Sequence, residues 1–368
     1  MQTLTFELTE QNLQEAIELA GSLLKRGEIV AVPSETVYGL AANAFNDFAV
    51  NKIYLAKGRP ANNPLILHVA KRYGLLSELA KCGLIKIEDM SELAQVAAQN
   101  LMNLYWPGPL TLVLPRGDGV SQAATAGLQT VALRMPKHQF LIKLLENLEF
   151  PLAAPSANLS MATSPTSAQH VRQDLSEKIP LIIDAGSCKV GLESTILKIS
   201  KTGQVKILRY GAITPDTLIQ DGFIIEKETS ELLTQKIEAP GMFALHYAPK
   251  AMFFYVKSPS TLRLEINFKL EKRCIVVIAL SDEHESSEQF AAEVMRFFAD
   301  MLVEGEIRFK TLYLDHGGIC VENVARNLYS TLRQADALNP DLIVMQSSES
   351  TFGLWLAIHD RMKRAANK

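Results

Sequence analysis

Hydroxyl and carboxylate side chains gather in the stretch PSETVYGLAANA, residues 33–44. An apolar run leads into it, so Ser34, Glu35, Thr36 and Tyr38 stand at the end of a predicted strand. A turn there presents hydroxyl groups to a ligand without burying them, although a turn with a helix cap uses the same residues. The stretch therefore predicts either an ordinary cap or one wall of a polar site.

Two cations stand at the end of the next predicted helix, in Lys57-Gly58-Arg59-Pro60. The glycine allows close backbone approach and the proline ends the preceding helix. Lys57 and Arg59 either complement the helix dipole or bind phosphate groups. Amide and imidazole groups nearby, which a structural loop does not need, favour phosphate binding. They belong to Asn62, Asn63 and His68.

Three further clusters of polar side chains stand at predicted strand ends. Ser156 and Asn158 alternate along a strand end, so they point the same way. Arg134 ends an apolar strand, where a buried guanidinium needs an anionic partner. Ser194 begins one strand and Arg209 ends the next. Any one cluster is explained by a turn or a rim residue; together they indicate a shared polar site in this half of the chain.

Short apolar runs and helical periodicities alternate along the chain and must position these groups. Several strands near residues 180–211 follow one another without a helix, which favours a mixed sheet in residues 1–212. The predicted strands there are 27–34, 64–70, 109–115, 130–136, 151–158, 180–186, 194–200 and 205–211, and the predicted helices are 46–58, 90–105 and 138–148.

Beyond residue 249 strands and helices alternate strictly, which predicts a smaller Rossmann-like α/β domain with a parallel sheet over 250–368. The stretch between, 213–249, is poorly periodic and interrupted by Pro-Gly, so it is predicted to be a linker. The sequence contains neither a G-x-G-x-x-G after a strand nor a Walker-type loop. Phosphate binding must therefore rely on side chains.

The 368 residues are 48% hydrophobic and 21% charged, which is typical of a folded globular protein, and the formal net charge of -3 disfavours a globally basic nucleic-acid binder. The four cysteines form no C-x-x-C pair, which argues against a zinc ribbon or a disulfide scaffold. Neither a signal peptide nor a membrane-spanning run is recognisable. We expect a cytoplasmic protein that does not enter membranes.

The motifs SETVYGLAANA, KGRPxxxPL, LRMP, PSAN and GLEST-to-LRYG resemble the YrdC-like domain, and PGMFALHYAPK (240–250) resembles the linker of its two-domain form. Nearly the whole chain is similar to the two-domain threonylcarbamoyl-AMP synthase family. The resemblance implies a nucleotidyltransferase that condenses L-threonine, bicarbonate and ATP into threonylcarbamoyl-AMP. That product would pass to the transferase that forms N6-threonylcarbamoyladenosine in tRNA.

The resemblance also implies roles for individual residues. Lys57 and Arg59 would neutralise the triphosphate and developing charge, with Mg²⁺ held mainly by the ATP phosphates and no metal cage of the protein's own. His68 is implied as a threonine contact, and the sequence leaves open whether it is also a general base. The threonine contacts implied are Thr36, His68, Arg134, Ser156 and Ser194. The nucleotide contacts implied are Arg59, Asn63, Thr130, Asn158, Thr166, Arg209, His246 and Tyr247. The linker would fold over the site.

The alternative is a non-catalytic module that binds double-stranded RNA or tRNA. The net charge and the absence of interleaved aromatic and basic residues disfavour this as the main role, but leave room for weak RNA binding. A carbamoyl-transfer enzyme of hydrogenase maturation also uses a related domain, yet it carries cysteine pairs that this sequence lacks. An assay of product formation with threonine separates enzyme from binding module.

Overall fold

The computed structural model describes residues 2–226, 246–262, 270, 274–280, 285–301, 307–314 and 320–366; the side chains of 285, 286, 300 and 301 lie outside the described part. The chain divides into two compact units. The first contains Met1–Ser160 and Ser164–Phe243, and the second contains Met161–Thr163 and Ala244–Lys368.

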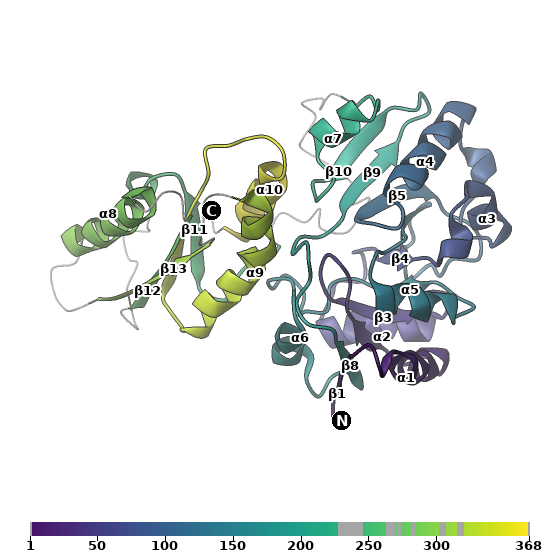
Figure 1. The fold of residues 1–368 in the computed structure, drawn as a ribbon, viewed down its shortest axis with the longest axis horizontal. Coiled ribbons are helices and arrows are strands. Elements are labelled where there is room, and N and C mark those ends of the chain that lie inside the picture. The colour runs from purple at the N-terminus through teal and green to yellow at the C-terminus, as the bar shows by residue number, and fades with distance from the viewer. Residues whose placement is uncertain are drawn as a thin grey trace. The chain divides into compact units, whose positions relative to one another are not determined.

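The first unit is built on a ten-stranded mixed sheet in the order β1-β8-β2-β3-β7-β4-β6-β5-β9-β10 (Figure 1). Parallel pairs such as β4–β6 and β5–β9 alternate with antiparallel pairs such as β5–β6. The strands are β1 Leu4–Glu7, β2 Val30–Val32, β3 Gly39–Asn43, β4 Ile66–His68, β5 Leu110–Pro115, β6 Thr130–Arg134, β7 Leu152–Ala153, β8 Leu181–Asp184, β9 Thr195–Ile199 and β10 Val205–Arg209.

Helices cover this sheet, and polar side chains cap the N-termini of several of them. The Asn46 side chain accepts from the backbone N–H groups of Phe48 and Ala49 at the start of α2, and Gly58 ends that helix in the left-handed conformation with φ 60°. The helices are α1 Leu13–Lys25, α2 Asp47–Lys57, α3 Leu76–Lys81, α4 Glu92–Tyr105, α5 Gln139–Glu146, α6 Ala168–Leu175 and α7 Pro215–Gln220, with short 3-10 turns at Lys71–Tyr73 and Ile87–Asp89.

Residue alternation gives the central strands two different faces. The main core includes one set of alternating residues, Leu67, Leu112, Leu133 and Leu197. The other face carries a small apolar cluster of Ile66, Val113, Ala132 and Ile196. The polar positions found by sequence continue this second face, because two residues along each strand bring the chain back to the same side. The fold therefore directs them away from the main core.

A single cross-strand row runs along that second face over five neighbouring strands. His68 pairs with Arg134, Arg134 with Thr111, Thr111 with Ile196, and Ile196 with Arg209. The register shifts between Ile207 and Arg209, and this irregularity places Arg209 opposite Ile196. Side chains at paired positions point to the same face of a sheet. Four polar side chains from separate strands are thus aligned.

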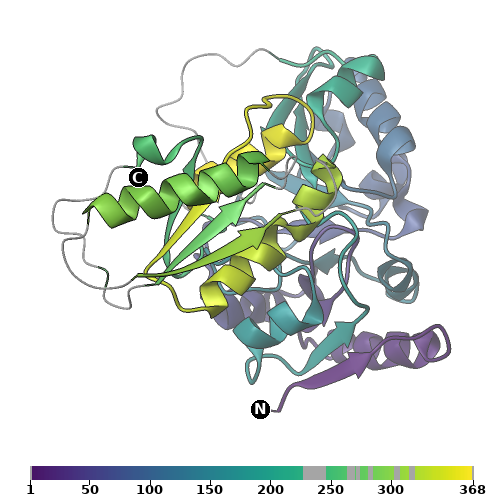
Figure 2. The same cartoon turned by 60° about the vertical axis from the view of Figure 1, so that its left-hand side comes forward.

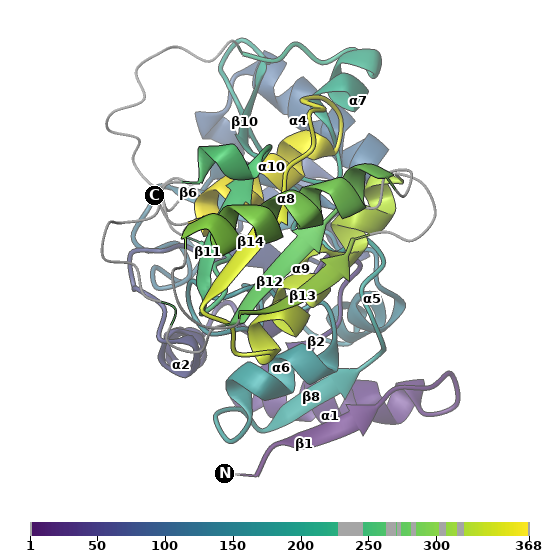
Figure 3. The same ribbon diagram turned by 90° about the vertical axis from the view of Figure 1, so that its left-hand side faces the viewer.

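The second unit contains a four-stranded parallel sheet in the order β11-β14-β12-β13, whose strands lie side by side in Figure 3. Figures 1 and 2 show α8 on one face of this sheet and α9 and α10 on the other. The elements are β11 Met252–Val256, β12 Cys274–Ala279, β13 Arg308–Tyr313, β14 Leu342–Gln346, α8 Glu285–Met301, α9 Val321–Ala337, α10 Trp355–Ala365 and a 3-10 turn at Pro259–Thr261.

The predicted fold class, a mixed α/β sheet followed by a smaller parallel-sheet unit, is confirmed. The short strands β1 and β3 were not predicted from the sequence. In the stretch predicted to be a linker, residues 213–226 include α7 and contribute Ile213 and Leu218 to the core of the first unit. Residues 227–245 of that stretch lie outside the described residues. None of the described helices combines the length and apolar character that crossing a membrane requires.

Candidate active site

The turn after β2 connects three of the polar clusters predicted from the sequence. Thr36 Oγ1 accepts from Arg134 Nη1 at the end of β6. The Tyr38 carbonyl accepts from the Ala157 backbone N–H at 2.8 Å, and the Tyr38 N–H donates to the Pro165 carbonyl at 2.9 Å. Within the turn, the Ser34 hydroxyl donates to the Val37 carbonyl at 2.6 Å. Residues 33–38 therefore hold the Pro155–Asn158 and Ser164–Thr166 segments close to the end of β6.

Arg134 is 4% exposed, and three other residues contact its guanidinium group. Its Nη1 donates to Thr36 Oγ1 at 2.9 Å, and its Nε donates to the Gly108 carbonyl at 3.2 Å. Its Nη2 lies 2.6 Å from Glu35 Oε1, which makes a buried ion pair. That approach is not aligned as a hydrogen bond, and Nη2 makes none with any described residue. A buried donor with unused capacity is rare in proteins and indicates a ligand position.

His68 occupies the register position next to Arg134. Burial and the neighbouring Arg134 charge lower the pKa of His68 to about 3. Its Nδ1 is buried without a hydrogen-bond partner among the described residues. A ring with so low a pKa stays neutral at physiological pH and is a weak base. Whether His68 is a contact or a general base stays a prediction.

Ser194 directly precedes β9, and its side chain is fully buried. Its hydroxyl is 2.7 Å from Thr111 Oγ1 and accepts from Arg209 Nη2 at 3.0 Å. The Arg209 Nε also donates to the Ser194 carbonyl at 3.1 Å. Arg209, predicted to contact nucleotide, thus directly supports a residue predicted to contact threonine.

Lys57 is a buried cation that binds the Ser156–Asn158 loop. Its Nζ donates to the carbonyls of Ser156 and Asn158, both at 2.5 Å, and to Asn158 Oδ1 at 3.3 Å. Burial and the nearby Arg59 charge lower the pKa of Lys57 well below its usual range. Lys57 therefore ties the end of α2 to this loop and brings two predicted clusters together.

Arg59 is bound to the residues that follow it. Its Nε donates to the Asn63 carbonyl at 3.1 Å, and its Nη2 donates to Asn63 Oδ1 at 2.5 Å and to the Pro64 carbonyl at 2.8 Å. Tyr54 donates to the same Asn63 carbonyl at 3.1 Å, and burial raises the pKa of Tyr54 to about 12. These hydrogen bonds fix the loop before β4 next to the side chains of Lys57 and Arg59.

The remaining predicted nucleotide contacts are placed differently. Thr166 is buried; its backbone N–H donates to His170 Nδ1 at 3.2 Å, and its Oγ1 lies 3.3 Å from the same nitrogen. Thr130 begins β6 and Arg134 ends it, so about 13 Å of extended strand separates them. His246 and Tyr247 belong to the second unit, where the His246 N–H donates to the Arg364 carbonyl at 3.1 Å. The roles of these residues stay predictions.

Two residues of the site received no role from sequence. Glu35 was recognised only as a member of its cluster, and its pairing with Arg134 depends on contact across 99 residues of chain. Thr111 is a fully buried hydroxyl inside an otherwise apolar strand, and that isolated polar residue was the available signal. Within the described part of the chain, no three His, Cys, Asp or Glu side chains form a group that could hold a metal ion.

Two family models match the chain. The Sua5, YciO and YrdC model, described as telomere recombination, matches residues 22–211. The model described as threonylcarbamoyl-AMP synthase, C-terminal domain, matches residues 208–367. Together they extend over both units.

Full-length relatives and a solved structure agree with these matches. The threonylcarbamoyl-AMP synthase of Pyrococcus abyssi is 37% identical, covering 99% of this chain and 98% of its own. That of Bacillus subtilis is also 37% identical, covering 98% and 95%. The crystal structure of P. abyssi Sua5 complexed with L-threonine aligns with a TM-score of 0.79 at 33% identity, over 99% of this chain and 98% of the other. The chain belongs to the threonylcarbamoyl-AMP synthase family, a family of transferase-type enzymes.

Proposed function

We propose that this enzyme is an L-threonylcarbamoyladenylate synthase. It condenses L-threonine, bicarbonate and ATP into threonylcarbamoyl-AMP and releases pyrophosphate and water. Family membership supports the type of product, and the solved relative with bound L-threonine supports threonine as a substrate. The observation that carries the proposal is the cross-strand row on the second face of the sheet, in which Arg134 and His68 retain buried, unused hydrogen-bonding atoms side by side.

Threonine would occupy the part of this row around Arg134. A guanidinium suits a carboxylate because its planar fork matches two oxygens, and Arg134 Nη2 has the required donor capacity. His68 Nδ1 supplies a second buried polar atom for the substrate. Thr36 and Ser194 contribute hydroxyls from either side, as their contacts with Arg134 and Thr111 indicate. Ser156, in the Ser156–Asn158 loop, would be the last of the threonine contacts.

ATP would lie along the loops that Lys57 and Arg59 fix. The charges of these residues balance the triphosphate, and Asn63, Asn158, Thr166 and Arg209 add neutral and cationic donors. Because Thr130 lies at the opposite end of β6 from Arg134, a nucleotide that also contacts Thr130 would have to extend along this strand. Mg²⁺ would enter with ATP and be held mainly by its phosphates, where it neutralises charge.

The chemistry needs positioning and charge neutralisation more than a covalent nucleophile. The threonine amine attacks bicarbonate, forming a carbon–nitrogen bond with loss of water. A carbamate oxygen then attacks the α-phosphorus, and the bond to pyrophosphate breaks. The cations beside the loops stabilise the leaving pyrophosphate. The labile product would pass to the transferase that modifies tRNA.

Product analysis tests the proposal. The full chain is incubated with ATP, Mg²⁺, bicarbonate and L-threonine, and threonylcarbamoyl-AMP is sought by mass spectrometry, with isotopically labelled bicarbonate to mark the carbamoyl carbon. A labelled adduct that forms only when all components are present supports the proposal. Tight binding of tRNA without any adduct would instead favour the non-catalytic module, and serine in place of threonine measures amino-acid preference.

A further inference from the structure

The buried pair of Glu35 and Arg134 retains hydrogen-bonding capacity on both partners. Glu35 is 7% exposed, and its carboxylate atoms Oε1 and Oε2 accept no hydrogen bond from any described residue. Arg134 Nη2 likewise makes none, although it lies 2.6 Å from Oε1. The pair therefore offers unused acceptors and an unused donor at adjacent positions. Buried ions without further hydrogen bonds are costly, which makes a purely structural pairing a poor explanation.

A ligand that satisfies both partners must carry both charges. An anion alone would complete Arg134 but would be repelled by Glu35, and a cation alone would meet the reverse. An α-amino acid carries its ammonium and carboxylate on one carbon, which matches the closeness of the two side chains. Its carboxylate would bind Arg134 Nη2 while its ammonium donated to the Glu35 oxygens.

We propose that Glu35 is a specificity residue that binds the α-ammonium group of the amino acid whose carboxylate Arg134 binds. The inference rests on the proposed function and deepens it, because it assigns recognition of the amino group to a residue of this chain. It also explains why a carboxylate stands next to the arginine that must attract another carboxylate. Substrates with a carboxylate and no amine are rejected by the Glu35 charge.

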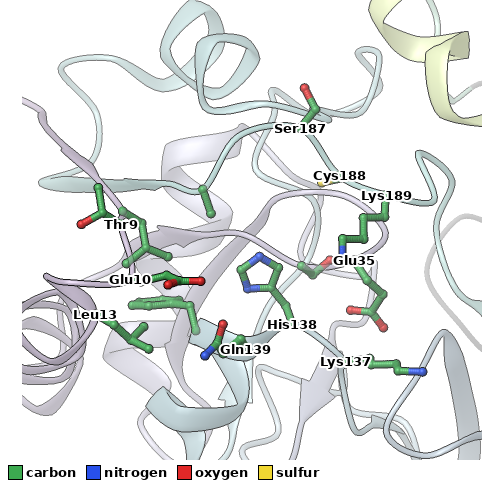
Figure 4. A pocket seen from close by; sticks show the side chains of 14 residues that line it. Thr9, Glu10, Leu13, Glu35, Lys137, His138, Gln139, Ser187, Cys188 and Lys189 are labelled. Carbon is green, nitrogen blue, oxygen red and sulfur yellow. The ribbon is translucent and has the colours of Figure 1, made fainter.

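Glu35 also lines a hollow of about 510 Å³ on the first unit (Figure 4). The hollow has an exposed rim, and Figure 4 shows Glu10 and Glu35 both lining it. Burial lowers the pKa of His138 and raises that of Cys188 to about 12, so both line the hollow as neutral groups. The titratable groups around Glu35 are Arg134 from β6, Lys137 and His138 before α5, Cys188 and Lys189 after β8, and Glu10 before α1.

Glu10 provides a matched control. It is an exposed carboxylate of the same hollow, whereas the ion pair with Arg134 is made by Glu35. E35Q keeps the shape of the side chain and removes its charge. E10Q makes the same chemical change on the rim.

Calorimetric titration of the full chain compares L-threonine with 2,3-dihydroxybutanoate, in which a hydroxyl replaces the α-amine. We expect the wild type to prefer threonine by at least about tenfold. E35Q should lose about tenfold in threonine affinity while binding the hydroxy acid as well as or better than before, and E10Q should keep the wild-type preference. Circular dichroism establishes that each variant is folded.

The outcomes are separable. A wild-type preference retained in E35Q would overturn the role of Glu35 and leave the proposed function intact. A wild type that binds no threonine would contradict both. If E35Q does not fold, E35D carries the test, because it keeps the charge on a shorter side chain. A preference reduced at least threefold in E35D supports the inference, and an unchanged preference overturns it.

Discussion

His68 and Arg134 are register partners in the parallel strands β4 and β6, so an imidazole and a guanidinium lie side by side on one face of the sheet. Both are buried, at 5% and 4% exposure. Desolvation already disfavours a charged His68, and the adjacent Arg134 charge disfavours it further. Arg134 therefore carries the positive charge here, and the neighbouring His68 ring is neutral.

This pairing predicts a loss of stability in acid. The pKa of His68 is lowered to about 3 in the folded chain, against about 6.5 when unfolded, so the unfolded state binds a proton first as the pH falls. Stability from this group is present above pH ~6.5 and is lost as the pH falls towards ~3. Between pH 7 and pH 5 the loss is about 2 kcal/mol.

Urea unfolding of the wild type and H68N at both pH values measures this loss. The other histidines are common to both proteins, so the difference isolates His68. We expect H68N to be less pH-dependent by about 2 kcal/mol over this interval. Identical pH dependence in the two proteins would show that His68 titrates normally.

Arg134 should control the threonine requirement. Replacing it with alanine removes the donor expected for the substrate carboxylate, so the KM for threonine should rise at least about tenfold while that for ATP changes less than about threefold. K137A is the control, because Lys137 is an exposed cation three residues further on. Steady-state product formation gives both constants. Equal rises for the two substrates would contradict the assignment.

Much of the fold was predictable because its signals are local. Apolar runs such as 130–136 and 205–211 predicted β6 and β10 within two residues, and helical periodicity predicted α2 and α4. Strand β1 escaped detection because it has only four residues and none of them is fully buried, although apolar and polar residues alternate along it. Strand β3 was hidden in a motif rich in glycine and alanine, whose strand propensity is low.

The site was predictable by residue type but not by arrangement. A cation, an imidazole and a hydroxyl at strand ends identified Arg134, His68 and Ser194, since buried polar groups in apolar strands are unusual. Which of them meet depends on the strand order and on the irregularity that places Arg209 opposite Ile196. Neither is encoded in local spacing. The Lys57 contacts with the Ser156–Asn158 loop likewise join segments about 100 residues apart.

Lys57 should be needed for both stability and turnover. K57M leaves the part-buried Ser156 carbonyl and the buried Asn158 carbonyl without their donor, at a cost of about 1–3 kcal/mol, and removes a cation expected to balance the triphosphate. K52M on the same helix is the control, because the Lys52–Glu28 ion pair is about 40% exposed and contributes about 0–1 kcal/mol. Urea unfolding and product formation measure the two effects. Near-normal turnover by K57M would remove Lys57 from the mechanism.

Arg209 and Ser194 should act as one unit. Because Arg209 donates to both oxygens of Ser194, R209A should raise the KM for threonine as well as that for ATP. S194A and R209A should then be non-additive, with a coupling of about 0.5–3 kcal/mol in kcat/KM for threonine. A double-mutant cycle of steady-state rates provides this number. Strict additivity would mean that the two residues serve their ligands independently.

Gly211 should be indispensable because of what surrounds it. A Cβ there would lie 2.4 Å from the Thr195 backbone nitrogen and 2.7 Å from the Glu193 carbonyl, closer than real Cβ atoms approach. G211A must therefore displace the backbone that carries Ser194, and we expect a loss of at least about 2 kcal/mol together with a raised KM for threonine. G21A is the control: the nearest atom to its Cβ is Leu144 Cδ1 at 3.9 Å, and alanine favours a helix interior by about 0.5–1 kcal/mol. Urea unfolding should rank G21A at or above the wild type and G211A well below it. A G211A protein with wild-type stability and threonine KM would show that the 193–195 backbone can move without affecting the site.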